Sequence, residues 1–434
     1  MRARFLFVLD LGLCCWTLTA QAFEPKPDDS YFARFKPMEA PAPTGLALRK
    51  GDRLAICGDS ITEQKMYSRI IETYLTACVP ELEITVRQYG WSGERAPGFL
   101  ARLTNDCLRF RPTIATTCYG MNDHEYRRFE DRIGRTYRGS STAIVQAFKA
   151  HGARVILGSP GCVGRNPPWS QAKEATTEDL NLNLCQLRNL GIAIAAQEKV
   201  GFADVFWPML VAGFEAQEKY GADYAVPGKD GVHPGWAGHV IMAYAFLKAF
   251  GLDGDLGTFT VDLAQGKARA SGGHEIVTFK EGELKITSRR YPFCTAAGDL
   301  TKDNSIRSGM TLVPFNAELN RLLLIVKNGS ASSYKVTWGQ ETRSYSSEQL
   351  AKGVNLAEDF VVNPFSIAFK KVDEAIAAKQ NYETRQIKDL FHGPEGHADP
   401  KLTAKLTEKV RTPLARAIKA AFVPVTHTIK IVAE

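Results

Sequence analysis

Short apolar runs alternate with segments of helical spacing over the first half of the chain. We predict strands at 54–57, 82–86, 113–118, 155–158 and 203–206. We predict helices between and after them at 62–77, 96–103, 143–150, 180–197 and 237–250. This alternation is typical of an α/β fold with a mainly parallel sheet and helices on both faces. Sites in such sheets lie at the carboxyl ends of the strands.

The pattern changes after Gly254. Further strands are predicted at 259–263, 283–287, 322–326, 334–338 and 428–432. Helix starts are indicated by the capping box Ser346 to Gln349, by Asn363-Pro364 and by Asp399-Pro400. The sequence therefore predicts a C-terminal β-rich module with helices over 256–434, to which it assigns no role.

The N-terminus has the pattern of a secretory signal peptide over 1–22. Arg2 and Arg4 precede a mostly apolar stretch, and a small-x-small site ends at Ala22. Cleavage is favoured over lipidation, because no small residue precedes Cys14. We expect a secreted or periplasmic protein that begins with a proline-rich lead-in over 23–50. No later run is long enough to predict a membrane span.

Composition narrows the class of partner. Hydrophobic residues make up 44% of the chain and charged residues 23%, as in a globular protein. The formal charge of +7 is spread along the chain without a dense basic block, so we expect no nucleic-acid partner. Disulfides are considered for Cys78–Cys107 or Cys162–Cys185. No C-x-x-C spacing supports zinc, and His392 and His397 are interpreted as polar loop residues, so no metal is expected.

Ser60 is the first candidate for chemistry. It follows the apolar strand at 54–57 and precedes a helix, so its hydroxyl would lie beside free helix N–H groups that favour negative charge. The alternative is a helix cap, since Ser60-Ile-Thr-Glu63 is itself a capping box. The two interpretations are compatible, because a capping serine is also held at the helix N-terminus.

Asp230 and His233 supply the partners that a serine nucleophile needs. They are three residues apart with Gly231 between them, a spacing that lets the carboxylate reach Nδ1 and leaves Nε2 for Ser60. The alternative for His233 is a surface-loop histidine. His239, at the start of the next helix, is expected to be structural.

Two further segments follow predicted strands. Gly90-Trp-Ser-Gly93-Glu follows the second strand, and Tyr119-Gly-Met-Asn122-Asp123 follows the third. Each alone is an ordinary turn. Together they offer a glycine N–H and a side-chain amide, the donors that an oxyanion hole requires.

These four segments, in this order, resemble the blocks of the SGNH hydrolases, also called GDSL esterases. The resemblance covers about 50–252, and we assign a hydrolase domain to 51–255. It implies a three-layer α/β/α sandwich around a parallel sheet of about five strands. It also implies Ser60 as nucleophile, His233 as base and then acid, and Asp230 as the residue that orients His233. The implied oxyanion hole is the N–H of Ser60 and of Gly93 with the amide of Asn122, and the chemistry needs no cofactor.

The substrate is less constrained. The segment 87–94 resembles the second block of the family's carbohydrate esterases, and we expect Trp91, Tyr119 and Trp169 to line a groove, although each aromatic could instead be packing. The favoured hypothesis is an exported esterase that deacetylates a carbohydrate. Its substrate would be a small-molecule or polysaccharide ester. The alternatives are a broad carboxylesterase or lysophospholipase, and a catalytically silent glycan-binding protein.

Overall fold

A five-stranded parallel sheet forms the centre of the N-terminal half of the molecule. The computed structural model describes residues 22–434, so nearly all of the predicted signal peptide lies outside the described residues. The strand order is β2-β1-β3-β4-β5. The strands are β1 (Arg53–Gly58), β2 (Thr85–Gln88), β3 (Ile114–Cys118), β4 (Arg154–Gly158) and β5 (Gly201–Ala203). All neighbouring pairs are parallel, as the alternating pattern predicted.

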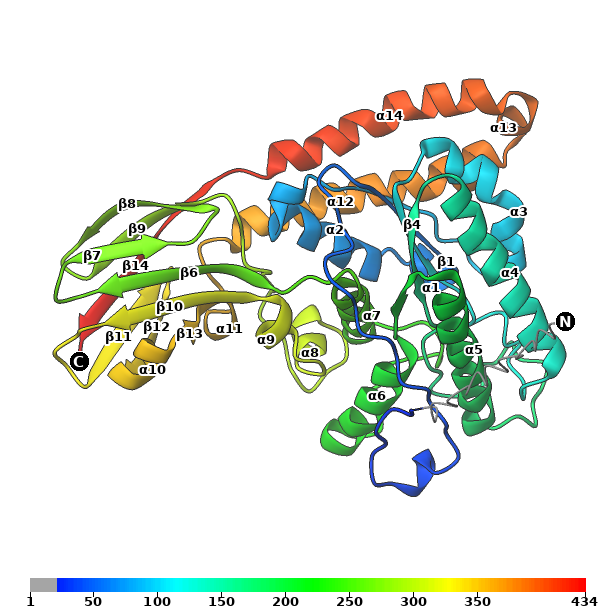
Figure 1. Ribbon diagram of the computed structural model, residues 1–434, viewed down its shortest axis with the longest axis horizontal. Helices are drawn as coiled ribbons and strands as arrows, with labels where there is room; N and C mark the ends of the chain where they lie inside the picture. The colour runs from blue at the N-terminus through cyan, green and yellow to red at the C-terminus, as the bar shows by residue number, and fades with distance from the viewer. Residues whose placement is uncertain (1–21) are drawn as a thin grey trace, which may run out of the picture.

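Helices cover both faces of this sheet (Figure 1). One face packs against α2 (Tyr67–Ala77), α6 (Phe206–Tyr220) and α7 (Trp236–Ala249). The other packs against α3 (Ala96–Asp106), α4 (Asp131–Ala150) and α5 (Thr177–Glu198). Along β1, Leu54 and Ile56 join the first core whereas Ala55 and Cys57 join the second, because successive strand side chains point to opposite faces. The expected three-layer α/β/α sandwich is confirmed.

Strand β2 begins later than the sequence predicted. Pro80 opens the short helical turn η2 (Pro80–Leu82), and Glu83 then adopts a left-handed conformation with φ of 51°. A strand cannot continue through that backbone, so pairing with β1 starts at Thr85.

The C-terminal half contains two further sheets. The first has the order β13-β10-β6-β7 and the second β12-β11-β14-β9-β8. The strands are β6 (Asp255–Asp262), β7 (Lys267–Ala270), β8 (His274–Lys280), β9 (Glu283–Ser288), β10 (Arg321–Lys327), β11 (Ser333–Trp338), β12 (Glu341–Ser346), β13 (Val354–Asn355) and β14 (Val425–Ala433). The short helices are α8 (Ile306–Met310), α9 (Phe315–Leu319), α10 (Ser347–Lys352) and α11 (Leu356–Asp359). The predicted β-rich region with helices is confirmed.

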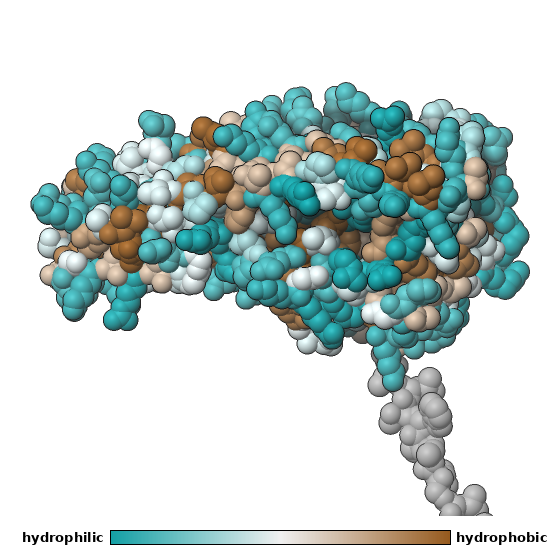
Figure 2. Space-filling view, turned by 90° about the horizontal axis from the view of Figure 1, so that it is seen from above, coloured by the Kyte–Doolittle hydropathy of each residue, from teal (hydrophilic) through white to brown (hydrophobic). Residues whose placement is uncertain are grey.

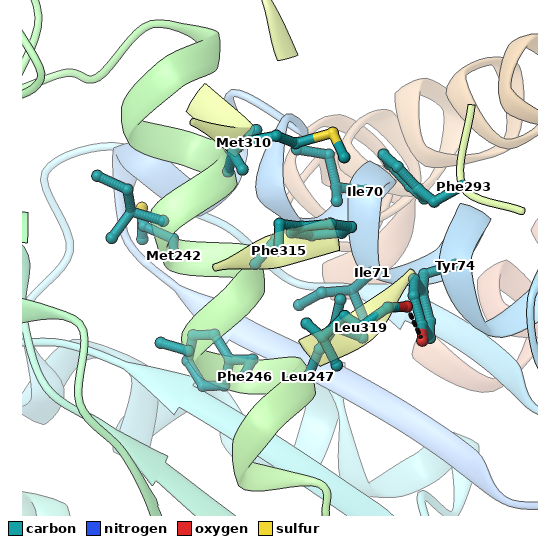
Figure 3. Packing of buried hydrophobic residues seen from close by; sticks show 14 of the residues in the cluster. Ile70, Ile71, Tyr74, Met242, Phe246, Leu247, Phe293, Met310, Phe315 and Leu319 are labelled. Atoms are coloured by element: carbon teal, nitrogen blue, oxygen red, sulfur yellow. Dashed lines mark hydrogen bonds between the residues drawn. The ribbon is translucent and has the colours of Figure 1, made fainter. Parts of the chain in front are cut away.

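The two halves share one hydrophobic core. Figure 3 shows side chains of α2 and α7 packed against those of α8, α9 and the segment before them. Within this cluster Phe315 lies beside Tyr74, with their ring centroids 6.4 Å apart. The Tyr74 hydroxyl donates a hydrogen bond to the backbone oxygen of Leu319 at 2.6 Å. The β-rich region is therefore joined to the sandwich by packing as well as by the chain.

A helical arm runs back from the β-rich region over the sandwich (Figure 1). We define the arm as α12 (Ser366–Arg385), the π-helical turn η4 (Gln386–Phe391), α13 (Pro394–Ala398) and α14 (Pro400–Ala421). Buried Lys379 of α12 binds Glu72 of α2 at 3.0 Å and Glu383 at 2.9 Å. The chain then returns along α14 and supplies β14, an inner strand of the second sheet. The surface seen from above is largely hydrophilic, with apolar patches among the polar residues (Figure 2).

The lead-in packs against the sandwich. Phe32, in the turn η1 (Ser30–Phe32), is buried with its ring centroid 5.7 Å from that of Trp207. Glu24 pairs with buried Arg188 at 3.2 Å. Within residues 22–434, no helix is both long and apolar enough to cross a membrane.

All cysteines of the described residues are free and buried, so neither disulfide considered from the sequence is formed. Cys78 packs in the core on one face of the sheet and Cys107 in the core on the other, which separates that pair. Cys162 and Cys185 lie in the same core but remain thiols, and burial raises the pKa of Cys162 to about 12. These cysteines act as small apolar side chains.

Candidate active site

Ser60 lies at the carboxyl end of β1, as the first residue of α1 (Ser60–Glu63). The expectation that Ser60 itself caps this helix is wrong. Asp59 is the N-cap, and its carboxylate accepts the N–H of Ile61 at 3.0 Å. The Glu63 carboxylate binds Ser92 and Lys388 instead of closing a capping box. The Ser60 hydroxyl therefore makes no capping hydrogen bond to the helix.

Ser60, His233 and Asp230 form one hydrogen-bonded chain. The Ser60 Oγ lies 2.8 Å from Nε2 of His233. On the other side of the ring, Nδ1 lies 2.7 Å from Oδ2 of Asp230. Since the carboxylate can only accept, Nδ1 carries a proton, so the tautomer that this contact favours has its Nε2 lone pair directed at the Ser60 hydroxyl. This arrangement can withdraw a proton from Ser60.

The turn that carries Asp230 and His233 holds itself in place. The second carboxylate oxygen, Oδ1, accepts the backbone N–H groups of Val232 and His233, both at 2.9 Å. Burial opposes ionisation of Asp230, but these bonds and the imidazole outweigh it and lower the pKa of the carboxyl. Gly164 donates its N–H to the backbone oxygen of Gly231 at 2.9 Å, which ties the turn to the loop after β4. Asp230 is thus kept charged beside His233.

The candidate oxyanion donors lie in the loops after β1, β2 and β3. Gly93 has φ of 74°, a left-handed conformation that favours glycine. Within residues 22–434, the backbone N–H groups of Ser60 and Gly93 have no intramolecular acceptor. The Asn122 amide donates to the backbone oxygen of Glu94 at 3.1 Å and accepts the Tyr126 hydroxyl at 3.1 Å, which fixes its orientation.

Two buried carboxyl groups hold these loops. Asp123 accepts the N–H of Ala96 and of Gly120, both at 3.0 Å, and so joins the loops after β2 and β3. Burial raises the pKa of Asp123 to about 6 and that of Asp59 to about 7. Asp59 holds the start of α1 and Asp123 holds the two loops that follow β2 and β3.

Of the three aromatic residues expected to line a groove, only Trp169 is exposed beside the candidate triad. It is 42% exposed, and its ring centroid lies 5.8 Å from that of His233. The expectation for Tyr119 is wrong, because it is only 3% exposed and its hydroxyl donates to the Glu94 carboxylate at 2.9 Å. Trp91 is half-buried between Arg102 and the arm residue His392. It packs against the arm rather than lining an open groove.

Sequence reasoning missed several charged residues around Gly93. Glu94 lies inside the second block and binds Arg102, two turns into α3, at 2.6 Å. Lys388 and His392 come from the arm, and His392, interpreted above as a polar loop residue, binds buried Asp106 at 2.7 Å. No local pattern marks the two arm residues, because their partners lie 325 and 286 positions away.

Comparisons with known proteins agree with this geometry. A family model for the GDSL-like lipase/acylhydrolase family matches residues 56–241. None of the curated proteins matches the chain. A solved structure of a gut microbial diltiazem-metabolizing enzyme is similar, with a TM-score of 0.70 and 22% identity over 91% of this chain and 100% of that chain. That likeness shows a shared fold that extends into the C-terminal half.

Smaller structures match only part of the chain. An acetylxylan esterase from Geobacillus stearothermophilus has a TM-score of 0.40 and 23% identity over 48% of this chain and 97% of its own. The family match together with the hydrogen-bonded serine and histidine decides between the classes considered, and a silent glycan-binding protein is no longer favoured. Residues 56–241 therefore form a domain of the GDSL-like lipase/acylhydrolase family, and the chain is a serine hydrolase that acts on ester bonds.

Proposed function

We propose that this enzyme is exported and removes short acyl groups, acetate foremost, from carbohydrate through an acyl-enzyme formed on Ser60. The observation that carries the proposal is the hydrogen-bonded chain from Ser60 through His233 to Asp230, with distances of 2.8 and 2.7 Å. A serine at this position with an oriented imidazole can attack an ester carbonyl.

Acylation begins when the Ser60 oxygen bonds to the carbonyl carbon while its proton passes to Nε2 of His233. The carbonyl oxygen becomes an oxyanion, which accepts hydrogen bonds from the N–H of Ser60 and Gly93 and from the Asn122 amide. The intermediate then expels the alkoxide, which takes the proton from Nε2 and leaves as the alcohol. Asp230 stabilises the imidazolium that exists between these two transfers.

Deacylation repeats these steps with water. Nε2 removes a proton from the water as its oxygen attacks the acyl-enzyme carbonyl. The second intermediate collapses, Ser60 recovers its proton from His233, and the carboxylic acid is released. The enzyme returns to its starting state without a cofactor.

Trp169 supports a carbohydrate as the alcohol part of the ester. It is 42% exposed beside His233, and the Tyr126 ring lies 6.0 Å from it. An exposed aromatic ring with a polar edge can pack against the apolar face of a sugar while water still reaches the sugar hydroxyls. The predicted signal peptide supports export, and amino-terminal sequencing of exported protein should then begin at Phe23.

A panel of esters tests the proposal. The panel comprises acetylated xylan, acetylated pectin and nitrophenyl esters of increasing acyl length, with acetate release or nitrophenol as the readout. We expect acetate release from polysaccharide by the wild type and by Ser332→Ala, an exposed serine of the β-rich region, but not by Ser60→Ala. Hydrolysis of long acyl chains alone would favour a lysophospholipase. Full activity of Ser60→Ala would reject the nucleophile.

A further inference from the structure

Gly93 lies between two residues that are both held by charged side chains. On one side, the backbone N–H and the hydroxyl of Ser92 donate to Oε2 of Glu63, at 2.5 and 2.6 Å. On the other side, the Glu94 carboxylate accepts two hydrogen bonds from Arg102, at 2.6 and 2.7 Å. The position of the Gly93 N–H therefore depends on two separate carboxylates.

The first carboxylate is bound by the arm. Nζ of Lys388 donates to Oε1 of Glu63 at 2.7 Å, with side chains that are 26% and 18% exposed. Burial opposes the charge on Glu63, but Lys388 and Ser92 outweigh it and lower the pKa of this carboxyl. Glu63 also ends α1, the helix that begins with Ser60. One ion pair thus joins the arm, the nucleophile's helix and the loop that carries Gly93.

The second carboxylate is also linked to the arm. Arg102 donates to Oδ2 of buried Asp106 at 3.3 Å, and Nε2 of His392 lies 2.7 Å from the same oxygen. The backbone oxygen of Glu94 accepts the Asn122 amide at 3.1 Å. This network therefore connects His392 to Asn122, which is also a candidate oxyanion donor.

The loop has little room to move independently of α1. A Cβ on Gly90 would lie 2.2 Å from the backbone nitrogen of Glu63, so the loop passes directly against the first helix. Lys388 lies in the π-helical turn η4, and His392 is the residue that follows this turn. Trp91 packs against both, with its ring centroid 5.4 Å from Nζ of Lys388 and 4.8 Å from the centroid of the His392 ring. Such turns are frequent at functional sites.

We propose that the C-terminal arm is a working part of the active site, in which Lys388 is a positioning residue that acts through Glu63 to hold the Gly93 N–H toward the oxyanion. His392 supports the same loop through Asp106. The inference rests on the proposed function, which makes Gly93 an oxyanion donor. An oxyanion donor acts mainly in the transition state, so its displacement lowers kcat more than it changes KM.

Lys388→Met in the full chain tests this role, with hydrolysis of nitrophenyl acetate as the assay. We expect kcat to fall about 10- to 100-fold with KM nearly unchanged, since small displacements of catalytic groups have effects of this size. Lys388→Arg should restore most of the rate. Lys370→Met is the matched control, because Lys370 is an exposed arm lysine that pairs with Glu374 of the same helix, at 3.7 Å.

Glu63→Gln separates positioning from folding. It keeps an acceptor for Ser92 but removes the charge that Lys388 binds, so it should lower kcat in the same way. Combining Glu63→Gln with Lys388→Met should add little, because both act through one contact. Wild-type kcat in folded Lys388→Met or in Glu63→Gln would overturn the inference. An active Ser60→Ala would instead overturn the proposed function.

Discussion

The Ser60 hydroxyl lies 2.8 Å from Nε2 of His233, although 173 positions separate the two residues. Asp59 makes this contact available, because it caps α1 and leaves the serine free. Asp230 orients the ring from the other side at 2.7 Å. Each residue of this hydrogen-bonded network can be substituted separately, and the expected effects differ.

Asp230→Asn should lower kcat by about 10³–10⁴-fold for a nitrophenyl ester. An amide that offers its N–H to Nδ1 favours the tautomer with the proton on Nε2, which cannot accept the Ser60 proton. Asp223→Asn is a matched control, because Asp223 is an exposed residue before the same loop. Wild-type kcat in Asp230→Asn would reject its proposed role.

Asn122→Ala should lower kcat by about 10²–10³-fold with little change in KM, the effect of removing one oxyanion donor. Tyr126→Phe removes only the hydroxyl that binds Oδ1 of Asn122, so we expect a smaller loss of kcat in the same direction. Steady-state kinetics of the two variants would check this order. A larger loss in Tyr126→Phe than in Asn122→Ala would contradict it.

Asp59→Asn should stabilise the protein at alkaline pH. Burial raises the pKa of Asp59 to about 7, above its ordinary value of 3.8. The folded state therefore binds this proton more tightly than the unfolded chain, and the contribution of Asp59 to stability falls as pH rises from about 4 to about 7. Asparagine is neutral and caps helices equally well.

Urea unfolding at about pH 5 and about pH 8 measures this difference. The gain in unfolding free energy should be small at the lower pH and larger at the higher one, on the order of a few kcal/mol for the full pKa shift. A gain that is independent of pH would show that the carboxyl titrates normally. Asp28→Asn, at an exposed position of the lead-in, is the control.

Ser288→Ala should destabilise the β-rich region without changing the active site. The Ser288 hydroxyl lies 2.8 Å from Nδ1 of His274 and 2.9 Å from Nε2 of His427. Trp338 donates its indole N–H to the other nitrogen of His427 at 3.0 Å, so Nε2 is the donor to Ser288. Burial lowers the pKa of His427 to about 3, which keeps this ring neutral.

Loss of the hydroxyl removes the partner of Nδ1 of His274 and of Nε2 of His427, while each ring keeps its other hydrogen bond, to Leu256 and to Trp338 respectively. Leaving these two ring nitrogens without a partner should cost about 1–3 kcal/mol. The measurement is urea unfolding at neutral pH, with kcat as the second readout and Ser332→Ala as the control. We expect lower stability with normal kcat. Unchanged stability would mean that the two histidines find other partners.

Local patterns were sufficient for much of this protein. Alternating apolar runs predicted the parallel sheet, because strands buried on both faces require continuous apolar residues. The spacing of Asp230 and His233 predicted their contact, since a three-residue turn can bring a carboxylate to its own loop's imidazole. The position of Ser60 after β1 followed from the same pattern, because strand ends meet at one edge of a parallel sheet.

Tertiary structure alone decided which of several polar side chains serves each role. Ser60 and Asp59 can both cap a helix, and only the approach of His233 shows why Asp59 does so. Tyr119 has a sequence context that fits a groove, yet packing of the loops buries it.

The arm illustrates the limit of local information most clearly. Asp399 caps α14 as predicted, whereas α12 begins at Ser366 with Phe365 as its N-cap, later than Asn363-Pro364 indicated. The packing of these helices over the sandwich was not predictable from local patterns. Lys388 meets Glu63 across 325 positions, and His392 meets Asp106 across 286. Hydrophobic periodicity determines which face of a helix is buried, whereas its partner is determined by the complementary surface that the rest of the fold presents.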